Sequence, residues 1–212
     1  MIILAKVLTS ATQMEKFTSF IFICFFSLIV CGQQKDSAGK LFSMLSEKAQ
    51  KQALIIQRLS DYSYIEGNQF GKFCSKDTTG RIILTNDSLK GKVVFVNFWF
   101  ESCKYCHNLF EPLNQLSAHY KDNPYFRLIS FTFDLPEVLE KNSTKYGLKY
   151  PVLYLEDSAC HSLLIDKGFP ANFLLDKTGK IVLGTGVGKF LANPKFFDEE
   201  IIPRIDSLLK QN

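Results

Sequence analysis

Residues 92–106 read Lys92-Val93-Val94-Phe95-Val96-Asn97-Phe98-Trp99-Phe100-Glu101-Ser102-Cys103-Lys104-Tyr105-Cys106. A run of β-branched and aromatic residues ends in a short polar turn, and two cysteines follow with two residues between them. The run is too short for an ordinary helix and too apolar for a surface strand, so we interpret it as a strand buried on both faces. Apolar residues then recur at helical spacing, namely Leu109, Phe110, Leu113 and Leu116. The pattern places Cys103 where a buried strand passes into a helix.

This position predicts different chemical roles for the two cysteines. At the start of a helix the backbone N–H groups are unpaired and the helix dipole favours an anion, which lowers the pKa of a thiol. Cys103 is therefore predicted to be the exposed nucleophile, and the positive charge of Lys104 beside it favours the thiolate. Cys106, one turn further along, is predicted to be the more buried resolving thiol that cleaves a mixed disulfide.

A zinc half-site and a purely structural disulfide are the rival interpretations of the CxxC motif. Structural zinc takes four ligands, usually from paired motifs. The sequence has no second CxxC, and its three histidines are scattered at positions 107, 119 and 161. A strand-to-helix junction is an unusual place for a purely structural disulfide. We therefore expect a redox-active dithiol that uses no cofactor and no metal.

Composition sets the limits of the interpretation. The 212 residues include 20 phenylalanines and carry a formal charge of +4 without a basic block. This length suits one globular domain with extensions, and the phenylalanines supply enough apolar bulk for its core. A modest positive charge without clustering predicts no nucleic-acid binding.

Residues 1–32 are interpreted as a targeting segment. The apolar run over 17–30 is shorter than the roughly 20 residues of a membrane-spanning helix and has the length of a signal-peptide core. Met14 is the better start for such a peptide. Leu28-Ile29-Val30-Cys31 is similar to a bacterial lipobox, which predicts a lipid anchor at Cys31, and cleavage after Gly32 is the alternative. In both cases the domain works outside the cytoplasm, in the cell envelope or periplasm.

The remainder of the chain alternates strand-like and helix-like segments. Residues 33–69 are predicted to form a tether and an amphipathic helical extension, the helix over 40–59. Residues 70–212 are predicted to form one α/β domain. Strands are expected at 81–84, 126–133, 152–155, in the segment 168–176 and at 181–183, and helices at 136–146, 158–165 and 196–209.

Residues 73–183 resemble the thioredoxin-fold proteins of the TlpA/ResA type, which are exported thiol-disulfide oxidoreductases of bacterial envelopes. The resemblance rests on Asp77-Thr78-Thr79-Gly80, on Leu89-Lys90-Gly91-Lys92, on Asn97-Phe98-Trp99 before the CxxC, and on Gly168-Phe169-Pro170-Ala171-Asn172-Phe173-Leu174-Leu175-Asp176. It implies a thioredoxin-like fold, in which a central mixed sheet is flanked by helices and preceded by an N-terminal β-hairpin and a helical extension. It also implies that Pro170 is a cis-proline facing the CxxC, and that Trp99, Phe169 and Pro170 bind substrate.

Some residues depart from that family's pattern. Ser102 stands where a tryptophan usually precedes the first cysteine, and Lys104-Tyr105 lacks the common proline. Asn97 replaces the buried acid of cytoplasmic thioredoxins, so proton handling at Cys106 needs another group. Glu101 is a candidate, with a solvated loop charge as the alternative.

Two further cysteines lie within the predicted domain. Cys74 and Cys160 either form a second disulfide or remain two buried free thiols that behave as small apolar residues. We favour two separate thiols.

The resemblance implies a disulfide reductase of exported proteins, with a membrane thiol-reducing partner as electron donor. Apocytochromes c are typical clients of the family. One alternative is a non-catalytic lipoprotein that uses the fold as a binding module. Another is a thiol peroxidase, although Phe100 and Val96 stand where that chemistry wants a threonine and a proline. The direction of exchange depends on the redox potential, which the sequence does not give.

Overall fold

The computed structural model describes residues 44, 47, 48, 51, 62–77, 79, 81–164 and 168–211. The chain divides into two compact units, Met1–Ala53 and Leu54–Asn212. The described residues of the first unit are helical. The targeting segment 1–32, with Met14 and Cys31, and most of the expected helix over 40–59 lie outside the described residues. Within the described part of the chain, no helix combines the length and apolar character that crossing a membrane requires.

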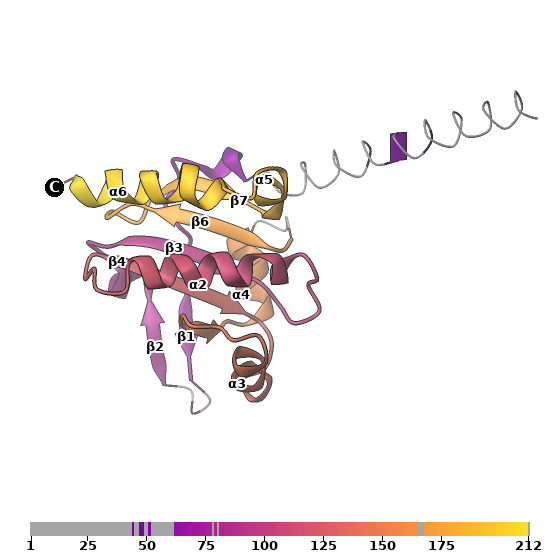
Figure 1. Cartoon of the computed structure of the whole chain (residues 1–212). Coiled ribbons are helices and arrows are strands. Elements are labelled where there is room, and N and C mark those ends of the chain that lie inside the picture. Colours follow the sequence, from indigo (N-terminus) through magenta and orange to yellow (C-terminus); the bar gives the residue numbers. More distant parts are fainter. Residues whose placement is uncertain are drawn as a thin grey trace, which may run out of the picture. The chain divides into compact units, whose positions relative to one another are not determined.

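A five-stranded mixed sheet forms the centre of the second unit (Figure 1). Its strands are β3 (Val93–Phe98), β4 (Phe126–Thr132), β5 (Val152–Tyr154), β6 (Ala171–Leu175) and β7 (Ile181–Thr185). They are arranged in the order β5-β4-β3-β6-β7, with β3, β4 and β5 parallel and β6 and β7 antiparallel to their neighbours. The predicted α/β class and thioredoxin-like mixed sheet are confirmed.

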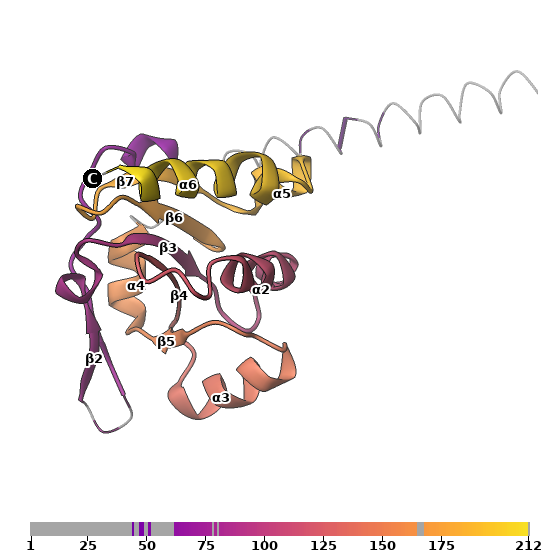
Figure 2. The same ribbon diagram turned by 60° about the vertical axis from the view of Figure 1, so that its left-hand side comes forward.

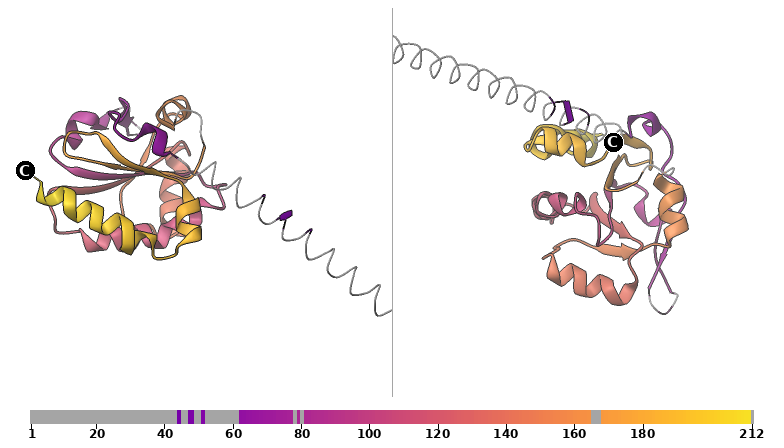
Figure 3. Two further views of the ribbon diagram at one scale, coloured as in Figure 1. Left: turned by 90° about the horizontal axis from the view of Figure 1, so that it is seen from above. Right: turned by 90° about the vertical axis from the view of Figure 1, so that its right-hand side faces the viewer.

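Helices cover both faces of this sheet. Helices α2 (Phe110–His119) and α6 (Ile202–Lys210) lie on one side of it and α4 (Asp157–Leu164) on the other, as the right-hand view of Figure 3 shows. Successive side chains of a strand point to opposite faces. Val93 and Phe95 accordingly pack with the α2 and α6 residues, whereas Val94, Val96 and Phe98 pack on the α4 side. Every residue of β3 is buried, as predicted for a strand enclosed on both faces.

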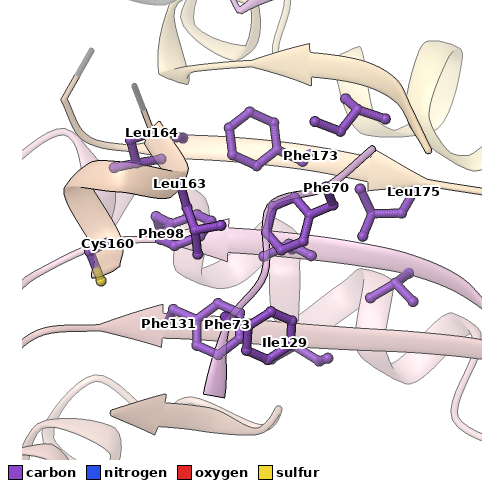
Figure 4. Packing of buried hydrophobic residues seen from close by; sticks show 14 of the residues in the cluster. Phe70, Phe73, Phe98, Ile129, Phe131, Cys160, Leu163, Leu164, Phe173 and Leu175 are labelled. Carbon is purple, nitrogen blue, oxygen red and sulfur yellow. The ribbon is translucent and has the colours of Figure 1, made fainter. Parts of the chain in front are cut away.

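Phenylalanines dominate the core on the α4 side (Figure 4). The ring of Phe131 on β4 lies 5.0 Å from that of Phe73 and 5.4 Å from that of Phe98 on β3. Fully burying one such side chain contributes about 1.5–3 kcal/mol of transfer free energy. This core therefore fixes the positions of the neighbouring ends of β3 and β4, where the candidate site lies.

The predicted N-terminal hairpin is confirmed as β1 (Cys74–Lys76) and β2 (Ile82–Thr85). Figure 2 shows it extending beyond the central sheet. The hydroxyl of Ser75 donates a hydrogen bond to the carbonyl of Tyr154 at 2.8 Å, which ties the hairpin to the edge strand β5.

The C-terminal part differs from the prediction in two places. Helix α5 (Val187–Ala192) was not expected, and the helix expected over 196–209 is divided. A π-helical turn over Phe197–Ile201 precedes α6, which places Pro203 in the first turn of α6. Proline has no N–H to donate, so it interrupts the regular i→i−4 hydrogen bonds of an α-helix, and the chain forms the wider π turn immediately before it. The remaining helix α3 (Pro136–Lys145) follows β4 as expected.

Candidate active site

Cys103 and Cys106 form a disulfide directly after β3, with their Cα atoms 5.3 Å apart. Cys103 is 8% exposed and Cys106 is 1% exposed. The first cysteine is thus the more accessible one, in the order that the sequence predicted. It is nevertheless much less exposed than expected, because Trp99, Cys106 and Phe110 pack around it in one cluster.

The helix does not begin at Cys103, which corrects the sequence prediction. A 3₁₀ turn over Cys106–Leu109 comes first, and α2 begins only at Phe110. Two tight turns precede it: the N–H of Cys103 donates to the carbonyl of Phe100, and the N–H of Cys106 donates to the carbonyl of Cys103, both at 3.0 Å. These turns occupy the chain where the first helical turn was expected.

One backbone donor still points at the first sulfur. The N–H of Cys106 lies 3.2 Å from Cys103 Sγ in hydrogen-bonding geometry. A hydrogen bond to the charged form of an acid lowers its pKa. Once the disulfide is reduced, this N–H favours the thiolate form of Cys103. It thus provides the stabilisation that was expected from the N-terminus of a helix.

Trp99 packs in the same cluster as Cys103 and Cys106, and its side chain is completely buried. Its ring lies 4.9 Å from the ring of Phe110 and 6.3 Å from that of Tyr146, in edge-on geometry with both. In this structure the side chain of Trp99 offers no surface to a substrate, and its contact with substrate stays a prediction. Its indole Nε1 is buried without a hydrogen-bond partner.

The Phe169–Pro170 peptide bond is cis, as the resemblance implied. Because Phe98 pairs with Ala171 across β3 and β6, Pro170 lies at the end of β6 that adjoins Trp99. The proline ring is buried, whereas Phe169 is half-buried and packs against the cluster that contains both cysteines. Of the two residues, Phe169 offers the larger surface to a substrate.

Two phenylalanines that the sequence analysis did not select lie around Phe169. The rings of Phe100 and Phe133 are stacked at 5.2 Å, and their centroids lie 5.2 and 5.5 Å from that of Phe169. Phe100 and Phe133 come shortly after the ends of β3 and β4, which are parallel neighbours. The sequence could have indicated both residues, because residues that follow the carboxyl ends of adjacent parallel strands meet at one edge of the sheet.

Three contacts hold Glu101, in the turn before Cys103. Its N–H donates to Asp134 Oδ2 at 2.7 Å, and its carbonyl accepts a hydrogen bond from His107 Nε2 at 3.0 Å. Its carboxylate pairs with Lys145 Nζ at 3.2 Å. The hydrogen bond from Lys145 lowers the pKa of Glu101, so this group stays a carboxylate at neutral pH. A carboxylate with a lowered pKa is a weaker base, which favours the alternative of a loop charge, and proton handling at Cys106 by Glu101 stays a prediction.

Asn97 belongs to a buried network of neutral groups. Its Nδ2 donates to Asn172 Oδ1 at 2.9 Å, and its Oδ1 accepts from the hydroxyl of Ser130 at 2.7 Å. Asn172 Nδ2 then donates to the carbonyl of Thr185 at 3.3 Å. The network joins β4, β3, β6 and β7 without a titratable group among these four residues.

Cys74 and Cys160 are not bonded, as favoured from the sequence. The expectation that both thiols are buried is wrong for Cys74, which is exposed at the start of β1, and correct for Cys160, which is fully buried on α4. Burial raises the pKa of the Cys160 thiol to about 12. This side chain behaves as a small apolar residue of the core.

Comparisons with known proteins agree with this geometry. A family model described as the AhpC/TSA family matches residues 67–183. The chain is 35% identical over 117 residues to a thiol-disulfide oxidoreductase ResA of Bacillus cereus, a match covering 55% of this chain and 66% of that protein. It is 30% identical over 121 residues to ResA of Bacillus subtilis, covering 57% and 66%. The chain thus spans about two thirds of the length of these relatives.

A solved structure supports the fold. The thioredoxin domain of a thiol-disulfide oxidoreductase from Bacteroides vulgatus superposes with a TM-score of 0.50 at 25% identity, covering 62% of this chain and 96% of that one. The resemblance recognised from the sequence is confirmed. With the family model matching more than half of its residues, the chain belongs to the AhpC/TSA family of thioredoxin-fold proteins, and its relatives include ResA thiol-disulfide oxidoreductases.

Proposed function

We propose that this chain is a thiol-disulfide oxidoreductase that reduces disulfides in exported proteins through Cys103 and Cys106. The observation that carries the proposal is the disulfide between these two cysteines beside the cis peptide of Pro170. The hydrogen bond from the Cys106 N–H to Cys103 Sγ supports the assignment of Cys103 as nucleophile.

The reaction has two steps. The Cys103 thiolate attacks one sulfur of a client disulfide, the client S–S bond breaks, and the departing client thiolate takes a proton from solvent. The Cys106 thiol then loses its proton, and its sulfur attacks Cys103 Sγ in the mixed disulfide. This releases the second client thiol and leaves the Cys103–Cys106 disulfide. The client gains two electrons, and a thiol-reducing partner must return two electrons to the dithiol.

The cellular setting is part of the proposal. The export signal lies within residues 1–32 and begins at Met14, where translation starts. Cys31 either receives a lipid anchor or is removed by cleavage after Gly32. Residues 33–69 then form the tether and extension that lead to the domain over 70–212, and the end of that segment packs on the domain through Tyr62 and the backbone of Gly67 and Asn68. The dithiol works in the cell envelope, where a membrane thiol-reducing protein supplies electrons.

The test is reduction of an oxidised model peptide by the pre-reduced chain, followed through the release of client thiols. Wild type is expected to reduce it and Cys103→Ser is expected to be inactive. Cys74→Ser, which removes an exposed thiol away from the pair, is the matched control and should keep full activity. Equal rates for wild type and Cys103→Ser would exclude the proposal.

The trapping variant Cys106→Ser addresses the alternatives. It should accumulate mixed disulfides between Cys103 and clients, because the resolving thiol is absent. Recovery of only non-covalent partners would favour the binding-module interpretation. Peroxide consumption by the pre-reduced wild type in the absence of any client disulfide would favour the thiol peroxidase.

A further inference from the structure

Tyr62 lies before the segment 67–183 that the family model matches, yet its side chain is completely buried in the domain. Its ring packs edge-on against Phe173 of β6, with the centroids 5.4 Å apart and the planes at 83°. Its hydroxyl donates a hydrogen bond to the carbonyl of Gly168, 106 residues further along the chain. One tyrosine therefore joins the N-terminal segment to the loop that leads into Pro170.

The backbone after Tyr62 is held firmly along β7. The N–H of Gly67 donates to the carbonyl of Ile181 at 2.8 Å, and the N–H of Ile181 donates to the carbonyl of Asn68 at 2.9 Å. The N–H of Gly184 donates to Glu66 Oε1 at 3.1 Å. These bonds fix the segment from which the tyrosine projects, so the position of its hydroxyl is determined by the sheet.

Gly184 allows this close approach. A Cβ atom at position 184 would lie 2.6 Å from the carbonyl oxygen of Tyr62 and 2.8 Å from its Cβ. Real Cβ atoms essentially never come so near, so any larger residue would push the segment away from β7. The lack of a side chain at Gly184 is therefore what allows the backbone of Tyr62 to pack directly against β7.

Gly168 is the residue through which Tyr62 reaches the site. It has a φ of +98°, a conformation that residues with a Cβ atom rarely adopt, and it directly precedes Phe169 and the cis peptide. Phe169 packs against the cluster of Trp99 and both cysteines. A hydrogen bond to the Gly168 carbonyl therefore restricts the orientation of the peptide that carries Phe169.

We propose that Tyr62 is a positioning residue for the client-binding loop 168–170, acting through the carbonyl of Gly168. The proposal rests on the proposed reductase function for the identity of the ligand, which is an extended polypeptide bearing a disulfide. Such a client must place a sulfur against Cys103, so its flanking residues contact the loop. Tyr62 holds that loop in one orientation before the client binds, and it takes no part in the thiol-disulfide exchange itself.

The experiment compares Tyr62→Phe with Tyr120→Phe in the full chain. Both variants remove one hydroxyl from a buried tyrosine and keep the ring. The hydroxyl of Tyr120 donates to Asp206 Oδ1 at 2.8 Å, between α2 and α6, and makes no contact with the loop. The same hydroxyl also lies 3.3 Å from the carbonyl oxygen of Ile202, so Tyr120→Phe loses at least as much hydrogen bonding as Tyr62→Phe without altering the loop. KM and kcat for an oxidised peptide, the alkylation rate of reduced Cys103 and amide exchange over 168–171 are measured for both variants.

Tyr62→Phe is expected to raise KM by roughly fivefold to tenfold, the ratio that corresponds to one buried hydrogen bond. It should leave the alkylation rate of Cys103 unchanged and speed amide exchange over 168–171. Tyr120→Phe should lower thermal stability similarly and alter none of these readouts. Equal KM values in the two variants, or a matching fall in Cys103 alkylation for Tyr62→Phe, would overturn the proposal.

The two proposals fail in different ways. A wild-type chain that reduces no peptide disulfide contradicts the proposed function. Amide exchange needs no activity, so unchanged exchange over 168–171 in Tyr62→Phe contradicts the positioning role whatever the enzyme does.

Discussion

The backbone N–H of Glu101 donates a hydrogen bond to Asp134 Oδ2 at 2.7 Å, so a carboxylate beyond the end of β4 holds the turn that leads into Cys103. The same oxygen accepts a hydrogen bond from the hydroxyl of Thr132 at 2.9 Å, and the N–H of Asp134 donates to that hydroxyl at 3.1 Å. Thr132 is itself fully buried in β4. The sheet therefore orients the carboxylate, and the carboxylate orients the reactive turn.

Asp134→Ala is expected to loosen this turn. Hydrogen bonds to a charged group contribute about 1.5–3 kcal/mol, so the variant should lose stability on that scale. The alkylation rate of reduced Cys103 should also change, because a mobile turn no longer holds Cys103 Sγ within hydrogen-bonding distance of the Cys106 N–H. Chemical denaturation measures the first effect and iodoacetamide kinetics measure the second.

Asp134→Asn is the control for this prediction. Its amide oxygen can still accept from the Glu101 N–H and from the Thr132 hydroxyl. The variant should therefore recover most of the stability and the wild-type alkylation rate. If Asp134→Asn were as impaired as Asp134→Ala, the negative charge rather than the hydrogen-bond geometry would be the important property.

Asn97→Ala is predicted to destabilise the sheet more than an exposed asparagine variant does. It removes the partner of both Asn172 and Ser130, which are 2% and 0% exposed. A buried polar group left without a partner costs about 1–3 kcal/mol, and here two lose a bond. Urea denaturation of Asn97→Ala beside Asn108→Ala, an exposed position, measures the difference. A change below about 1 kcal/mol would indicate that water replaces the lost partner.

The sequence predicted the sheet well because its strands carry strong and unambiguous patterns. Residues 93–98 are apolar enough to require burial on both faces, and β3 is buried throughout. The CxxC pair was predicted for the same reason, since its spacing after that strand specifies both position and chemistry. Periodicity contains no information, however, on where the first helical turn begins. The turns at Phe100 and Cys103 displaced it to Cys106.

The long-range contacts of the site could not be predicted from residue patterns. Asp134 and Tyr62 are distant in sequence from the residues they hold, and neither belongs to a motif. The resemblance implied that Trp99 contacts substrate, and no residue pattern indicated that its side chain is completely buried. Local pattern specifies which elements form, and packing between elements specifies which side chains reach the site.

Tyr150→Phe is expected to be neutral or stabilising. The hydroxyl of Tyr150 is buried without a hydrogen-bond partner, and burial raises its pKa above the ordinary value for tyrosine. Removing an unsatisfied polar group recovers its desolvation cost, about 1 kcal/mol or somewhat more. Thermal denaturation beside Tyr120→Phe, which loses a satisfied hydrogen bond, should move the two midpoints in opposite directions. A lower midpoint for Tyr150→Phe would reveal a partner for that hydroxyl in solution.

The two separate thiols should react very differently with iodoacetamide in the folded protein. Cys74 is exposed and should be alkylated under mildly alkaline conditions, whereas Cys160 is fully buried with a raised pKa and should not be. Peptide mapping after denaturation in a second, isotopically distinct reagent distinguishes the two sites. Early labelling of Cys160 would indicate that α4 opens readily.

The raised pKa of Cys160 also predicts alkaline destabilisation with a defined sign. The ordinary thiol pKa is 9.0 and burial raises it to about 12, so between these values the unfolded chain releases a proton that the folded chain retains. Fewer protons bound in the unfolded state mean that the free energy of unfolding falls as pH rises. From about pH 9 to about pH 10 the loss due to this thiol is about 1 kcal/mol. Three buried tyrosines whose pKa is also raised, Tyr62, Tyr120 and Tyr150, add about 1 kcal/mol to the same decline in both proteins. The free energy of unfolding of Cys160→Ala should therefore fall by about 1 kcal/mol less than that of wild type over this interval, and parallel declines would contradict the assignment.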